Sequence, residues 1–169
     1  KMEEKSSSIY PKEKDKMYAL LVKQMEGLME AENHWLAAFS NASAVLKGAL
    51  EEVNWVGFYV MNQGSLLLGP FQGNIACIRI AVGSGVCGGA VQKDEILMID
   101  NVHDFEGHIP CDCASNAEIV LPIHLNGEVI AVLDIDSPQF KRFDLKDKNG
   151  LESLVKMLEN KINFNGITG

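Results

Sequence analysis

Apolar residues recur every three or four positions over two stretches near the N-terminus, residues 15–31 and about 33–50. This spacing gathers the apolar side chains on one face of a helix, so each stretch is expected to form an amphipathic helix. Asn33 is the candidate cap of the second helix. A third helical pattern follows Asp144 near the C-terminus, where Asp144 and Asp147 are placed to cap the helix start.

Between these helices the period of the pattern changes to two, which is typical of strands. Strand patterns cover residues 54–60, 65–70, 76–82, 95–100, 117–125 and 127–136, with a short helix following residues 83–85. Most of these strands follow one another through turns, which favours an antiparallel sheet with helices on its faces. We expect one α+β domain with about six strands over residues 14–163, a flexible leader at 1–13 and a tail at 164–169.

The pairing of the last two strands decides where their acidic side chains lie. A two-residue loop over 126–127 would place Glu118 on the apolar face of the sheet. A three-residue loop over 125–127 pairs Glu118 with Asp134 and puts both on one side with Asp136. We expect the three-residue loop, because it leaves no acid on the core face. Three solvated carboxylates on an exposed face are the alternative interpretation.

Charge and hydropathy narrow the possible functions. The net charge of −8 gives no electrostatic support for binding nucleic acid or an anionic membrane. No apolar stretch approaches the roughly 20 residues of a membrane span, and the N-terminal residues lack the apolar segment of a secretory signal. We therefore expect a cytoplasmic protein. In the cytoplasm thiols stay reduced, so the four cysteines indicate redox or metal chemistry. The alternative is that most of them are only small hydrophobic residues of the core.

The glycine-rich stretch GSGVCG fits the dinucleotide fingerprint, but the downstream acids Asp100 and Asp104 come earlier than the expected spacing of about 20 residues, and no repeated βαβ pattern follows. Cys87 lies near the start of the helix that follows, where backbone dipoles would favour a thiolate. A metal site is also conceivable, but the spacing contains no C-x-x-C pair, so thiol chemistry is favoured over metal binding. Its candidate ligands are Cys77, Cys87, Cys111, Cys113, His103 and His108.

Trp55 and Tyr59 lie on one face of the first strand, with Gly57 between them. Core packing is the ordinary explanation of such a pair. The functional interpretation is a hollow over Gly57 in which the two rings hold a methyl, thioether or cationic group.

Taken together, several motifs resemble one known family, the free methionine-(R)-sulfoxide reductases, which are single GAF-fold domains. The resemblance covers about residues 54–144 and rests on NWVGFY, LLLGPFQG, ACIRI, GVCG, NVHDFEGHI, the spaced CD, AS and EIVLPI segments, AVLDIDSP and RFD. By position, three cysteines match the family's: Cys77, Cys87 and Cys111. Trp55 and Tyr59 match its aromatic substrate wall, and Glu118, Asp134 and Asp136 match its binding carboxylates. The chain departs from the family pattern at Ala81, Gly89, Pro110 and Cys113.

The resemblance implies a GAF-like domain that reduces free L-methionine (R)-S-oxide, not the protein-bound residue. Cys111 is then the expected nucleophile, which passes through a sulfenic acid to a disulfide with Cys77, while Cys87 is the rival nucleophile. Glu118 is the expected acid. No bound cofactor or metal is needed, because thioredoxin or a similar dithiol recycles the disulfide, and a homodimer is possible. The alternative is a non-catalytic GAF-type module that binds a small molecule or senses redox state.

Overall fold

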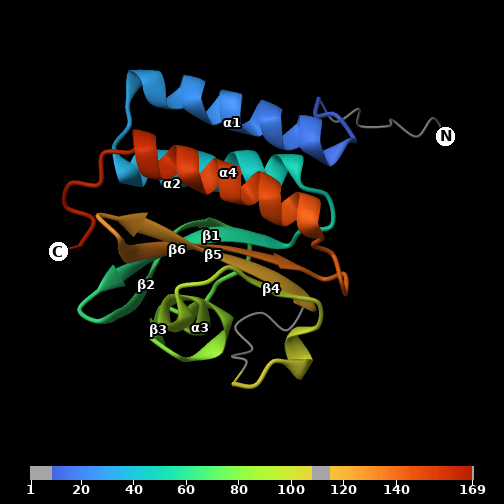
Figure 1. Cartoon of the computed structure of the whole chain (residues 1–169), viewed down its shortest axis with the longest axis vertical. Helices are drawn as coiled ribbons and strands as arrows, with labels where there is room; N and C mark the ends of the chain where they lie inside the picture. Colours follow the sequence, from blue (N-terminus) through green and yellow to red (C-terminus); the bar gives the residue numbers. More distant parts are fainter. Residues whose placement is uncertain (1–8, 108–114, 169) are drawn as a thin grey trace.

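The computed structural model describes residues 9–107 and 115–168 and has the expected α+β architecture. Figure 1 shows one sheet with three helices on one face, in two tiers, and a fourth helix on the other face. The helices are α1 (Lys14–Ala31), α2 (Trp35–Ala49), α3 (Gly85–Lys93) and α4 (Leu145–Lys161), with a 3-10 turn, η1, at Val102–Asp104. Helix α1 is the outermost element and packs on α2 and α4, which in turn pack on the sheet.

The six strands are all antiparallel and lie in the order β3-β2-β1-β6-β5-β4. Their bounds are Trp55–Asn62 (β1), Ser65–Gln72 (β2), Arg79–Ala81 (β3), Leu97–Ile99 (β4), Ala117–Leu125 (β5) and Glu128–Ser137 (β6). The third strand is shorter than the pattern over 76–82 predicted. The two longest strands, β5 and β6, are both paired on each side, and α3 packs on both, so that Glu118 of β5 and Asp134 of β6 are held away from bulk water.

Two helix starts test the predicted caps. Asp144 and Asp147 form the expected capping box at the start of α4, each side chain accepting a hydrogen bond from the other residue's backbone amide. The predicted cap at Asn33 is wrong by one position, because the ring of His34 accepts from the amide of Leu36 and caps α2. An imidazole nitrogen can fill the role of the usual hydroxyl or carboxylate oxygen at this site.

The predicted register of the β5–β6 hairpin is wrong, although the predicted face is correct. Leu125 pairs with Glu128 across a two-residue loop, in which Asn126 and Gly127 both have positive φ, as type I′ hairpins require. A β-bulge then shifts the pairing by one residue, so that Glu118 lies opposite Asp136. Because one extra residue reverses the facing of every side chain beyond it, the bulge returns the acids to one side of the sheet.

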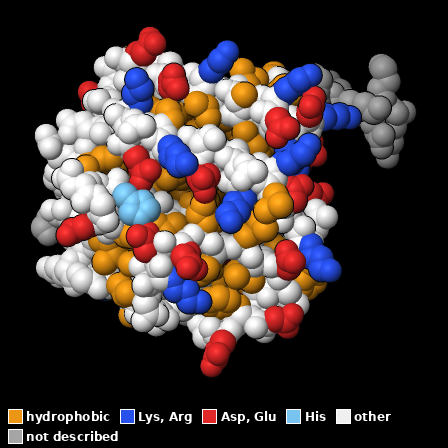
Figure 2. All heavy atoms as spheres, viewed as in Figure 1, with side chains coloured by type: hydrophobic (Ala, Val, Ile, Leu, Met, Phe, Trp, Pro, Cys, Tyr) orange, Lys and Arg blue, Asp and Glu red, His pale blue; other side chains and the backbone are white. Residues whose placement is uncertain are grey.

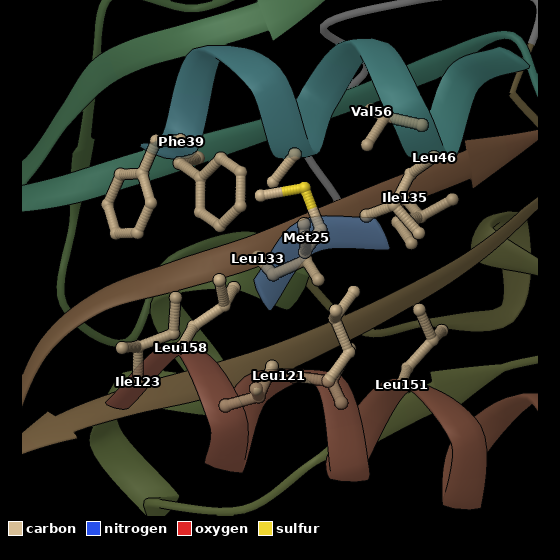
Figure 3. Close-up of a cluster of buried hydrophobic side chains, with 14 of the residues drawn as sticks. Met25, Phe39, Leu46, Val56, Leu121, Ile123, Leu133, Ile135, Leu151 and Leu158 are labelled. Carbon is tan, nitrogen blue, oxygen red and sulfur yellow. The ribbon is translucent and has the colours of Figure 1, made fainter. Parts of the chain in front are cut away.

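A larger and a smaller apolar cluster lie on opposite faces of the sheet. Figure 3 shows Phe39 and Leu46 of α2 and Leu151 and Leu158 of α4 directed at the sheet. The smaller cluster lies under α3 and includes Trp55, Tyr59, Cys87 and Val120. The packed core extends past the predicted domain limits, since Tyr10 bonds to Gln24 and both Phe164 and Ile167 are buried.

Acidic and basic side chains are interspersed over the face of the molecule that Figure 2 displays, which includes the helical tiers. Among the described residues, no helix has both the length and the apolar character that crossing a bilayer requires.

Candidate active site

Three neighbouring strands bring the sequence-predicted aromatic and acidic residues into one row. Trp55 of β1 pairs with Asp136 of β6, which pairs with Glu118 of β5, so the three side chains emerge side by side on the α3 face. The next row on this face pairs Gly57 with Asp134. The strands thus assemble from residues far apart in sequence an aromatic wall that ends in a carboxyl cluster.

The carboxyl cluster is largely closed to water. Glu118 and Asp134 are only 8% and 5% exposed, which is costly for two acids that lie close together. Burial, strengthened by the charges of Asp134 and Asp136, raises the pKa of Glu118 well above its ordinary value. Burial also raises the pKa of Asp134. Both shifts favour the protonated form, which makes a carboxylic acid the candidate donor at the end of the wall.

One atom of the cluster has no hydrogen-bond partner within the described part of the chain. The oxygen Oδ1 of Asp134 is buried without a donor, whereas a buried carboxylate oxygen in a folded protein normally accepts at least one hydrogen bond. Asp134 also lines a pocket. An incoming group that donates hydrogen bonds or carries positive charge would supply what this oxygen lacks.

Cys87, the third residue of α3, lies against the same cluster. Its sulfur is 4.0 Å from Oε1 of Glu118, and one donor atom from each of Cys87, Glu118 and Asp134 lies within 4.8 Å of the other two. The prediction that the helix start favours a thiolate is wrong, because burial and then the Asp134 and Glu118 charges raise the pKa of Cys87 well above its ordinary value. Desolvation and two neighbouring acids outweigh the dipole of a nine-residue helix.

The hollow predicted over Gly57 is filled. A Cβ atom on Gly57 would meet the Trp55 ring at 2.5 Å, so the ring itself lies over the glycine. The rings of Trp55 and Tyr59 stack on each other with centroids 5.9 Å apart, which leaves no space for a group between them. Phe71 stacks on Trp55 at 5.3 Å. A ligand would therefore rest against this wall of rings and not between two of them.

Hydrogen bonds tie the wall to the loop between β2 and β3. The indole nitrogen of Trp55 donates to the carbonyl of Asn74 at 3.1 Å, and the hydroxyl of Tyr59 donates to the carbonyl of Cys77 at 3.0 Å. Burial raises the pKa of Tyr59, so its hydroxyl stays protonated and keeps this bond. Cys77 is disulfide-bonded, whereas Cys87 is a free thiol. The wall therefore fixes the position of one half of a disulfide beside the site.

A pocket lies where these groups meet. Its lining includes Trp55, Tyr59, the three acids and Cys87, together with residues that were not singled out as site residues from the sequence: Ile75, Ala76, Ile80, Ser84, Gly85, Val86 and Ser115. Ser115 is buried and accepts a hydrogen bond from Asn54 at 3.3 Å. No periodic signal marks these residues, because separate loops and a helix start bring them together.

Several candidates lie elsewhere or cannot be placed. Cys111, the expected nucleophile, falls outside the described residues, as do Cys113 and His108. His103 is not part of the cluster, since its ring bonds to the side chain of Asn116 and packs beside Phe140. The metal-ligand set considered from the sequence is therefore not assembled among the described residues, and Cys87 instead groups with Glu118 and Asp134.

The sequence and the fold resemble those of known proteins over most of the chain. Residues 40–159 match the family model of the GAF domain. The chain is 50% identical over 146 residues to the free methionine-R-sulfoxide reductase of Escherichia coli, covering 86% of this chain and 88% of the relative. It is 39% identical over 153 residues to the Saccharomyces cerevisiae enzyme of that name, covering 86% and 85%. A solved structure of free methionine-R-sulfoxide reductase from Neisseria meningitidis, in complex with its substrate, superposes with a TM-score of 0.86 at 38% identity, covering 89% of this chain and 91% of that one.

Proposed function

The chain belongs to the free methionine-R-sulfoxide reductase family of GAF-domain proteins, and from this premise we propose that it reduces free L-methionine (R)-S-oxide to methionine. The observation that carries the proposal is the cluster of Glu118, Asp134 and Asp136 at the end of an aromatic wall, in which burial raises the pKa of Glu118. A sulfoxide amino acid needs an apolar surface for its thioether stem, an anion for its ammonium and an acid for its oxygen.

Glu118 acts as the acid in this proposal. A sulfoxide sulfur becomes electrophilic only when its oxygen is protonated or hydrogen-bonded, so the donor must hold its proton at neutral pH. The raised pKa of Glu118 supports this role. Asp134 and Asp136 hold the substrate's ammonium group, which would also satisfy the unpaired oxygen of Asp134. A methionine inside a peptide has no such ammonium, which explains a preference for the free amino acid.

Cys111 is the proposed nucleophile. Its thiolate attacks the sulfoxide sulfur, the protonated oxygen is transferred to the cysteine as a sulfenic acid, and methionine leaves. Cys77 then attacks the sulfenic sulfur, which forms the disulfide and releases water. The disulfide at Cys77 beside the pocket supports its resolving role. Two electrons pass from the two thiols to the substrate, and thioredoxin or a similar external dithiol restores them.

Cysteine variants test the sequence of steps. Each of Cys77→Ser, Cys87→Ser and Cys111→Ser would be mixed with excess sulfoxide without reductant, and the methionine released in one turnover counted. The nucleophile variant should release none, whereas the resolving variant should still release one methionine per chain. A normal burst from Cys111→Ser would refute the assignment of the nucleophile.

A second experiment tests the substrate class. Free methionine (R)-S-oxide should support thioredoxin-coupled NADPH oxidation, while the N-acetylated compound, which has lost only its ammonium charge, should not. The (S)-sulfoxide is the stereochemical control. Equal rates with the free and acetylated compounds would contradict the proposed ammonium site. Saturable binding of the free compound without methionine release would favour a non-catalytic GAF module instead.

A further inference from the structure

Two isoleucines lie exposed on either side of the disulfide-bonded Cys77. Ile75 is 91% exposed and Ile78 is 71% exposed, in the segment that joins β2 to β3. A single exposed aliphatic side chain is ordinary, but two within four residues present an apolar surface to water, and these two flank a disulfide. We call Ile75, Cys77 and Ile78 the disulfide rim.

Hydrogen bonds to the sheet hold the rim in place. The carbonyl of Cys77 accepts from the hydroxyl of Tyr59 at 3.0 Å. The carbonyl of Ile78 accepts from the backbone amide of Leu68 in β2 at 2.9 Å. The indole bond described above fixes the start of the same segment. The two isoleucines are therefore exposed by a backbone that is tied to its neighbours along its length.

The part of the chain that carries the rim is almost without charge. Of the 23 acidic residues none lies within residues 53–92, and Arg79 is the single basic residue there. The guanidinium of Arg79 donates to the carbonyl of Asn62 and to the hydroxyl of Ser65. A partner that approaches the rim therefore meets little of the negative charge that the rest of the chain carries.

We propose that the disulfide rim is the docking surface for the protein dithiol that regenerates the enzyme, and that this reductant attacks the sulfur of Cys77. The inference rests on the proposed function, since it concerns the last step of that cycle. Cys77 is half-buried, so an attacking thiol must approach closely. A protein whose thiol lies in an uncharged, apolar surface would then cover both isoleucines, as the core of a specific interface does. A small dithiol would reach the same disulfide without covering them.

The proposed step is a thiol–disulfide exchange. A thiolate of the reductant attacks the sulfur of Cys77, which forms a mixed disulfide and releases the other cysteine, Cys111 in the proposed cycle. The released thiolate takes up the proton that the first thiol lost. The second thiol of the reductant then attacks its partner sulfur and gives up its proton, and Cys77 leaves as a thiol. Two electrons pass to the enzyme, and the reductant is left as a disulfide.

The test compares Ile78→Ser with Leu145→Ser in the full-length chain. Ile78 is not among the residues that line the pocket. Leu145 is 66% exposed at the start of α4, on the opposite face of the sheet from α3 (Figure 1). Turnover of the sulfoxide is measured at varied thioredoxin concentration and again with dithiothreitol. Ile78→Ser should raise the KM for thioredoxin about tenfold and leave the rate with dithiothreitol unchanged, whereas Leu145→Ser should change neither.

Other outcomes overturn the docking surface. An unchanged KM for thioredoxin in Ile78→Ser would remove the rim from the interface. An equal loss with both reductants would place the effect on the disulfide itself. Turnover of the wild-type protein with dithiothreitol but not with thioredoxin would refute this inference alone, whereas no methionine release with either would end the proposed function.

A trapping experiment tests the point of attack without any variant of this chain. Thioredoxin in which the second cysteine of the pair is replaced by serine forms a mixed disulfide that it cannot resolve. After incubation with the oxidised enzyme, mass spectrometry of the peptides should place the bond at Cys77. A bond to another cysteine of this chain would refute the assigned attack.

Discussion

Replacing Gly57 by alanine should damage both the fold and the site, because this position has no space for a methyl group. A Cβ atom there would overlap Cβ of Phe71 and would lie 2.5 and 2.9 Å from two ring atoms of Trp55. Carbon atoms in contact are separated by about 3.5–4.0 Å, so the neighbours must retreat by about 1 Å. Phe71 is paired with Gly57 in the sheet and Trp55 is held by its bond to Asn74, so neither moves without disturbing its partner.

The expected cost follows from these constraints. Overpacking a filled core costs about 1–3 kcal/mol, and the smaller entropy of an alanine in the unfolded chain offsets about 0.4–1 kcal/mol of this. Gly57→Ala should therefore lose about 1–2 kcal/mol of unfolding free energy. With a slope of about 2 kcal/mol per molar urea, the middle of the usual range, the unfolding midpoint should fall by roughly 0.5–1 M. The KM for the sulfoxide should rise as well, since the displaced Trp55 ring forms the pocket wall.

Urea unfolding followed by tryptophan fluorescence measures the midpoint, and Gly27→Ala is the matched control. Gly27 lies inside α1, and a Cβ atom added there would have no other atom within 4 Å, so alanine should stabilise the protein by about 0.5–1 kcal/mol. Adding Trp55→Phe to Gly57→Ala should recover part of the loss, because the outer indole atoms are removed. A Gly57→Ala midpoint equal to that of wild type, with the control shifted upward, would refute the reasoning.

Three further predictions concern charged groups. Glu118→Gln should abolish turnover yet raise the melting temperature at pH 8 relative to wild type. A carboxyl whose pKa is raised in the folded state favours folding below its unfolded pKa, and this contribution is lost as pH rises through the folded pKa. An unchanged melting temperature at pH 8 would contradict the cost of burying the ionised Glu118. His124 lies between Asp94 and Glu159, 2.5 and 3.0 Å away, and its pKa is raised despite partial desolvation, because both carboxylates stabilise the cation. His124→Gln should therefore lower the melting temperature more at pH 5.5 than at pH 8.5, and an equal loss at both would rule out the ion pairs as the cause. Asp147 is fully buried and accepts hydrogen bonds from Lys14, Tyr18 and Arg142. Asp147→Asn should therefore lower the free energy of unfolding, measured in urea, by about 3–5 kcal/mol. A decrease under about 1 kcal/mol would show that this network does not hold α1 to α4.

Periodicity in the sequence determined the kind and order of the elements, since each helix and strand is defined by local spacing of apolar residues. Alternation along the last strand also placed Asp134 and Asp136 on one face, whereas the side on which Glu118 lies depends on how the two strands pair. The cysteine positions and the aromatic pair were likewise recognisable from motifs in the chain. These features need only information from within a few residues.

Tertiary structure decided the rest. The bulge in β6 is what sets Glu118 opposite Asp136, and a single extra residue in one strand leaves no signal in the hydrophobic pattern. The protonation of Cys87 depends on burial and on acids from β5 and β6, which a helix-start argument does not include. Trp55 fills the space over Gly57 because of how its ring turns in the folded sheet. Sequence thus specified which groups are present, while solvent exclusion and the distances between strands, both long-range properties, set their ionisation and the shape of the space between them.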